Sequence, residues 1–153
     1  MIDKKNLDGD LCFQVDTCTT LIKSFISSPS TIQGVKRVNG KHIYPDKIFR
    51  ELVTNALVHR NYAISGSKVR VFLFEDRLEI MSPGRLPNTV TIDKLPFGVS
   101  YAVNPVIVKF MENLRYIDQL GRGLPMVCQE AKKNGKKIEF AEIGESFKVT
   151  LEL

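Results

Sequence analysis

The segment between Pro45 and Arg60 constrains the fold of this chain more than any other. Proline suits the first turn of a helix, and the acidic Asp46 lies beside the positive end of the helix dipole. At about 100° per residue, the apolar residues of the segment form one broad arc: Ile48, Phe49, Leu52, Val53, Ala56 and Leu57. We therefore predict an amphipathic helix over residues 45–60 whose wide apolar face belongs to the core.

The rest of the chain alternates helical patterns with hairpin patterns. Apolar spacing predicts helices over 15–27, 106–114 and 124–134, the first with Asp16 or Thr17 near its start. Three hairpins are predicted, pairing 31–38 with 41–44 around Asn39-Gly40, 67–75 with 78–81, and 137–143 with 146–153. The imperfect alternation of residues 69–74 favours a strand covered on most of both faces. This order predicts an α+β fold, with helices on one mixed, mostly antiparallel sheet.

Composition limits the class of protein. The 153 residues are 43% hydrophobic and 25% charged, which fits one globular domain. We place an N-terminal segment and connector helix in residues 1–28 and the domain in residues 29–153. No apolar run suits a membrane span or a signal peptide, and three cysteines without framework spacing suit a reduced, cytoplasmic protein. The formal net charge of +5 permits nucleotide phosphates or nucleic acid as partners.

Polar residues on the predicted helix offer a first candidate site. Glu51 and Asn55 are one turn apart at the edge of the apolar arc, and His59 lies one further turn along, inside it. A carboxylate and a carboxamide so placed can hold a hydrated Mg²⁺ or orient a water molecule against a phosphate. The other interpretation is a polar helix edge with a hydrogen-bonded core histidine, and the spacing alone leaves both open.

A glycine-rich turn offers a second candidate site. Gly121-Arg122-Gly123 precedes a predicted helix, where glycines allow close backbone approach and the helix N-terminus offers N–H groups to phosphate. The alternative is an ordinary flexible loop. A P-loop is excluded, because neither Gly-Lys pair, at 40–41 or at 135–136, lies in a G-x-x-x-x-G-K-[ST] pattern. The chain alone is therefore not a helicase motor.

Four sequence blocks occur in a characteristic order. They are ELVTNALVHRNY at 51–62, IMSPGRLP at 80–87, the Gly98-Val-Ser100 and Asn104-Pro105 pair, and LGRGLP at 120–125. Together they resemble the ATPase-like domain of bacterial proteins described as RecG-related ATP-dependent DNA helicases or as transcriptional regulators. That domain is a divergent relative of the GHKL ATPases, which include DNA gyrase, histidine kinases and MutL. The resemblance covers residues 15–153.

The resemblance implies a GHKL (Bergerat-type) two-layer sandwich that holds Mg·ATP between its helices and a mobile lid of residues 84–104. It implies that Glu51 is the general base and that Asn55 ligates the nucleotide-bound Mg²⁺. Ser82 stands where active members carry an adenine-binding aspartate, and Val103 where the family commonly has an arginine. The other residues that it carries over to nucleotide-binding positions are His59, Gly84, Arg85, Gly121, Arg122 and Gly123.

We therefore expect a nucleotide-binding module of a DNA-linked regulator, which binds Mg·ATP weakly and hydrolyses it slowly or not at all. Related proteins join such a module to a separate DNA-binding domain, so we expect DNA to bind to neighbouring domains. Whether the chain forms a homodimer is left open. The alternative is a degenerate module that binds no nucleotide and serves as an interaction or DNA-binding platform. Its candidate DNA surface is a lysine cluster that otherwise forms a solvated helix end: Lys132, Lys133, Lys136 and Lys137.

Overall fold

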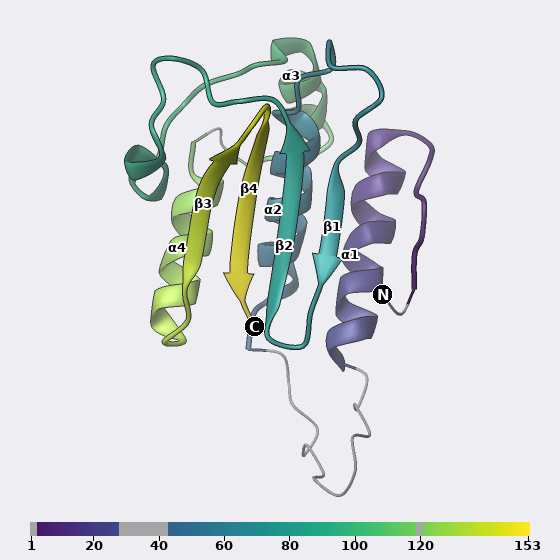
Figure 1. The fold of residues 1–153 in the computed structure, drawn as a ribbon, viewed down its shortest axis with the longest axis vertical. Helices are drawn as coiled ribbons and strands as arrows, with labels where there is room; N and C mark the ends of the chain where they lie inside the picture. Colours follow the sequence, from purple (N-terminus) through teal and green to yellow (C-terminus); the bar gives the residue numbers. More distant parts are fainter. Residues whose placement is uncertain (1–2, 28–42, 119–120) are drawn as a thin grey trace, which may run out of the picture.

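The fold is built on a four-stranded antiparallel sheet with the strand order β1-β2-β4-β3 (Figure 1). The computed structural model describes residues 3–27, 43–118 and 121–153. Leu78 and Ile80 of β2 and Val149 and Leu151 of β4 are buried, whereas the residues that alternate with them are only partly buried. Helices therefore cover one face of the sheet, which confirms the predicted two-layer α+β sandwich. The strands are β1 Arg70–Leu73, β2 Arg77–Pro83, β3 Ile138–Ile143 and β4 Ser146–Glu152.

Helix α2, Asp46–Val58, lies behind the sheet, and every residue of the predicted apolar arc is buried (Figure 1). Its C-terminal end is closed by two side chains from later in the chain. Asn104 Nδ2 donates to the carbonyl oxygens of Val58 and Arg60, at 2.8 and 2.7 Å, and the Tyr62 hydroxyl donates to the Leu57 carbonyl at 2.7 Å. A helix end leaves such carbonyl groups without intrahelical partners, so these bonds fix where α2 ends.

Helix α1, Leu11–Ser27, begins four residues before the predicted Val15. The prediction of a start near Asp16 or Thr17 is wrong, because Asp10 caps the helix instead. Its Oδ1 accepts a hydrogen bond from the backbone N–H of Phe13 at 2.9 Å. Several acidic and hydroxyl residues near the start satisfy the capping preference equally well in sequence, and only the three-dimensional contact distinguishes them.

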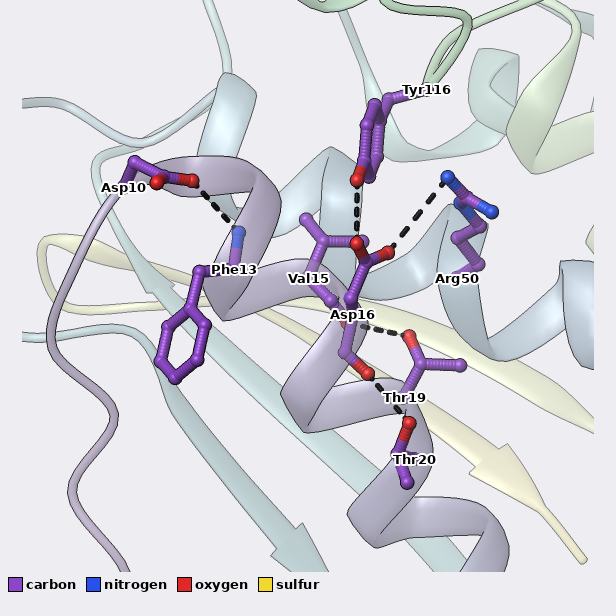
Figure 2. A network of polar contacts seen from close by, with 8 residues as sticks. All are labelled: Asp10, Phe13, Val15, Asp16, Thr19, Thr20, Arg50 and Tyr116. Carbon is purple, nitrogen blue, oxygen red and sulfur yellow. Dashed lines mark hydrogen bonds and ion pairs between the residues drawn. The ribbon is translucent and has the colours of Figure 1, made fainter.

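A polar network joins α1 to α2 and to the segment after α3 (Figure 2). The Tyr116 hydroxyl donates to Asp16 Oδ2 at 2.6 Å, and Arg50 Nη2 lies 3.8 Å from Asp16 Oδ1. The Arg50 guanidinium also lies over the Tyr116 ring, 4.3 Å from its centroid. The hydrogen bond to Asp16 raises the pKa of Tyr116 to about 12, because it is made by the protonated phenol. Asp16 is thus a link between elements.

Strand β1 is an edge strand that pairs with β2. Arg70 and Phe72 are exposed, whereas Val71 and Leu73 are half-buried. The predicted cover on both faces of this strand is therefore wrong. Only the side that faces the helices is covered, and the irregular hydrophobicity arises because apolar Phe72 points away from them.

The remaining described elements agree closely with the sequence patterns. Helices α3, Pro105–Asn113, and α4, Gly123–Lys133, and the β3–β4 hairpin lie within one or two residues of their predicted bounds. The expected lid contains a 3-10 helix, η1, Ile92–Phe97, whose Leu95 is buried in the core. The hairpin predicted around residues 39–40 lies outside the described residues. Among the described helices, none has the length and apolar character needed to cross a membrane.

Candidate functional site

Three polar residues follow one another about one turn apart, two of them on α2 and the third directly after its last residue. Glu51, Asn55 and His59 are each half-buried, while most of their neighbours on the helix are buried. Asn55 and His59 line both of two small cavities, of about 20 and 30 Å³. No hydrogen bond to the Asn55 carboxamide is found in the described part of the chain. The carboxamide is therefore available to a ligand.

The two cavities divide most of the predicted site residues into two groups. Arg122 is exposed and lines neither cavity. The first cavity combines Asn55 and His59 with residues at and after the end of β2: Ser82, Gly84 and Arg85. The second combines the same pair with residues at the start of α4: Gly121 and Gly123. Segments far apart in sequence therefore meet on one face of α2, as the order of the motifs predicts.

Ser82 and Gly84 fix the end of β2 against α2. Ser82 is buried, and its hydroxyl donates to the carbonyl oxygen of Ala56 at 2.7 Å, which leaves the hydroxyl oxygen able to accept a further hydrogen bond. Gly84 has a φ of 115°, and a Cβ there would lie 2.8 Å from Asn61 Cβ, so the position requires glycine. Arg85, more exposed, forms an ion pair with Glu142 of β3 at 2.9 Å.

Glu51 lies directly against Gly123, the first residue of α4. A Cβ built on Gly123 would overlap the Glu51 carboxyl group, so only glycine lets α4 approach α2 this closely. Burial, together with the smaller effect of the negative charge of Asp118, raises the pKa of Glu51 to about 7. A carboxyl group with a pKa near neutrality is suited to exchange a proton with water at the operating pH. Perturbed carboxyl groups of this kind are typical of functional sites.

Tyr101 is a site residue that sequence analysis did not identify. It lines both cavities, and its ring centroid lies 4.6 Å from that of His59, with the rings tilted by 36°. Burial lowers the pKa of His59 to about 4 and raises that of Tyr101 to about 12, so both rings are neutral at pH 7. His59 Nδ1 is buried, and no described residue forms a hydrogen bond with it. A single tyrosine in a loop gave no sequence signal for this contact.

Asn104, which closes the end of α2, also had no role assigned from the sequence beyond its place in the Asn104-Pro105 pair. The sequence did contain a signal for Asn104, because the Asn104-Pro105 pair precedes a predicted helix and has a fixed place in the order of the sequence blocks. The carbonyl groups that it binds are 46 and 44 residues earlier in the chain, so its role depends on tertiary structure.

The described residues contain no group of three or more His, Cys, Asp or Glu side chains that could hold a metal ion directly. A Mg²⁺ carried by phosphate groups needs few protein ligands, because it keeps several waters and takes oxygens from the phosphates. The carboxamide of Asn55 at both cavities fits that requirement.

Comparison with known proteins identifies the family. Residues 66–151, more than half of the chain, match the family described as "Putative ATP-dependent DNA helicase recG C-terminal". The chain belongs to this family. The match confirms the resemblance to RecG-related ATPase-like domains that the motif order indicated. Within the matched range lie Ser82, Gly84 and the Gly121–Gly123 turn, whereas Glu51 and Asn55 precede it.

A crystal structure of the DIP2311 protein from Corynebacterium diphtheriae has a similar fold, with a TM-score of 0.75 and 21% sequence identity. The similarity covers 94% of this chain but 28% of that chain, so this chain spans little more than a quarter of the length of that protein. At this level of identity the comparison establishes the shared fold. A search of curated proteins found no match.

Proposed function

We propose that this chain binds Mg·ATP between α2, the end of β2 and the start of α4, as the nucleotide-binding module of a DNA-linked regulator. The observation that carries the proposal is the convergence on one face of α2. Asn55 and His59 line both cavities, and the carboxyl group of Glu51 lies against Gly123. Membership of an ATPase-like family supports a nucleotide as the class of ligand. DNA would then be bound by neighbouring domains.

The two groups of residues suit the two ends of the nucleotide. The Ser82 hydroxyl oxygen can still accept a hydrogen bond, which suits an adenine amino group. The hydroxyl lacks the negative charge that strengthens such a bond to an aspartate. Gly121 and Gly123 lie at the N-terminal end of α4, where backbone N–H groups favour phosphate. Asn55 would hold the Mg²⁺, which when bound neutralises charge on the phosphates.

Glu51 is the residue that we propose accepts a proton from the attacking water. Because its pKa is about 7, a large fraction of the carboxyl groups is deprotonated at neutral pH and can act as a general base. We propose that turnover is slow, since Ser82 and Val103 stand where the resemblance places an aspartate and an arginine. Two charged contacts to the nucleotide are therefore missing.

The test is a titration of the purified chain with Mg·ATP, Mg·ADP and Mg·GTP, followed through backbone amide NMR shifts. We expect saturable, adenine-selective shifts at Asn55, Ser82–Gly84 and Gly121–Gly123. Asn55→Ala should abolish them, while Asn113→Ala, the same change at an exposed position on α3, should leave them intact. Unchanged spectra at millimolar nucleotide would contradict the proposal.

A second candidate function is favoured by an exposed apolar stripe on α3. Val106, Phe110 and Leu114 recur every four residues and are 83%, 53% and 46% exposed. Such a stripe is typical of a surface that another protein covers. A degenerate module acting as an interaction platform would self-associate or bind a partner through α3 without binding nucleotide. Light scattering of the wild-type chain and of Phe110→Asp, alongside the titration, distinguishes this function from the first.

A further inference from the structure

The cavities on the α2 face are far too small for a nucleotide. At about 20 and 30 Å³ they have room for only a few water molecules. Tyr101 lines both, together with Asn55 and His59. A nucleotide that reached from Ser82 to Gly123 would have to pass the residues that both cavities share, and Tyr101 is one of them.

The backbone around Tyr101 is held at both ends of a short strap, which we define as residues 98–104. At one end the strap packs on the glycine turn of the site. A Cβ on Gly98 would lie 2.7 Å from the Gly121 carbonyl oxygen, and one on Gly121 would lie 3.2 Å from Val99. At the other end, Asn104 is bound to the last turn of α2. Both ends of the strap are therefore held in place.

Between those ends, Val99 and Tyr101 are partly buried and pack against the core. In the described part of the chain, Tyr101 forms a ring contact with His59, and no hydrogen bond to its hydroxyl is found. Val103 is 38% exposed. Among the described residues, the buried His59 Nδ1 has no hydrogen-bond partner, and such an arrangement costs free energy. Movement of Tyr101, whose ring contacts that of His59, would open the cleft beside this histidine.

We infer that Tyr101 is a built-in occupant of the nucleotide site, and that the strap must withdraw it from His59 before a nucleotide binds. This inference rests on the proposed function. Because only molecules with the strap withdrawn can bind, the apparent affinity is lowered by the fraction of molecules in that state. Weak binding of Mg·ATP by this chain is thus a property of the strap as well as of the binding residues.

Two substitutions test the inference by calorimetric titration with Mg·ADP and Mg·ATP. Tyr101→Ala removes the ring and should tighten binding about two- to twelvefold, the factor that corresponds to one aromatic pair. Tyr101→Phe keeps the ring and should bind as the wild type does, because no described residue forms a hydrogen bond with the Tyr101 hydroxyl. Dispersed amide spectra check that each variant is folded.

A second measurement uses the wild-type chain, so it does not depend on a variant that folds. The chain has two histidines, and His59→Gln assigns their imidazole proton signals. The ring of Tyr101 shifts the His59 signal, so saturation with nucleotide should move that signal in the direction that Tyr101→Ala moves it. The other histidine, His42, serves as the internal reference.

The outcomes separate the inference from the proposed function. If the wild type binds nucleotide but Tyr101→Ala binds equally or more weakly, Tyr101 is a wall of the pocket and the inference is overturned. A His59 signal that stays fixed at saturating nucleotide overturns it as well. If neither the wild type nor Tyr101→Ala binds, the proposed function itself fails, and the inference falls with it.

Discussion

Replacing Glu51 with glutamine should stabilise the chain, and only above a definite pH. The pKa of Glu51 is about 7 in the folded protein, against an ordinary value of 4.5. The folded state therefore holds this proton more tightly than the unfolded state does. The free energy of unfolding is unaffected by Glu51 below pH 4.5, falls as the pH rises to 7, and is constant above that.

The size of the effect follows from those two values. At about 1.4 kcal/mol per pH unit, the interval from 4.5 to 7 corresponds to about 3 kcal/mol. Glutamine has nearly the same shape and is neutral at every pH. The difference in unfolding free energy between Glu51→Gln and the wild type should thus be small at pH 4, grow through pH 6, and reach about 3 kcal/mol at pH 8.

Urea unfolding at pH 4, 6 and 8 measures this difference. Glu75→Gln is the matched control, because Glu75 is exposed and the chemical change is the same. His59, with a pKa lowered to about 4, makes both proteins less stable as the pH falls below 6.5, and this contribution cancels in the comparison. A difference that does not depend on pH, or that matches the control, would refute the burial of a titrating carboxyl group beside Gly123.

Three further substitutions test separate contacts by the same unfolding assay. Gly123→Ala should destabilise the chain by about 1–3 kcal/mol, because the new methyl group overlaps the Glu51 carboxyl group; no loss would mean that α4 can shift freely. Arg115→Gly should stabilise it by about 0.5–1 kcal/mol, since Arg115 follows the C-terminal end of α3 with a φ of 61°, and a loss would show that the arginine side chain has a role. Asp10→Ala should cost about 1 kcal/mol by removing the cap of α1, and Asp8→Ala, outside the helix, is its control.

Local patterns in the sequence were sufficient for much of the fold. The residues that form the apolar arc of α2 lie within a few positions of one another in the sequence, and the same is true of the residues that form the β3–β4 turn. Periodicity and turn chemistry therefore identify both features. The start of α1 was misplaced because Asp10 and Asp16 are equally plausible caps until the contacts of Asp16 with Tyr116 and Arg50 are known.

The sequence predicted those residues of the candidate site that belong to a motif, but not the residue that reaches the site through a tertiary contact alone. The order of the sequence blocks placed Asn55, Ser82 and Gly123 on one site, and the cavities bring them to the same face of α2. The contact between the tilted rings of Tyr101 and His59 has no such pattern, because it depends on the path of the strap. Tertiary contacts of this kind leave no periodic trace in the sequence.

The strand order has a consequence for how the chain folds during its synthesis. Strand β4 lies between β2 and β3, although its residues are the last of the sheet to be translated. Until residues 146–152 leave the ribosome, β2 has an open edge and the core lacks Val149 and Leu151. The emerging chain therefore exposes apolar surface and an unpaired strand until this strand inserts, which makes that interval the one in which a chaperone would be most useful.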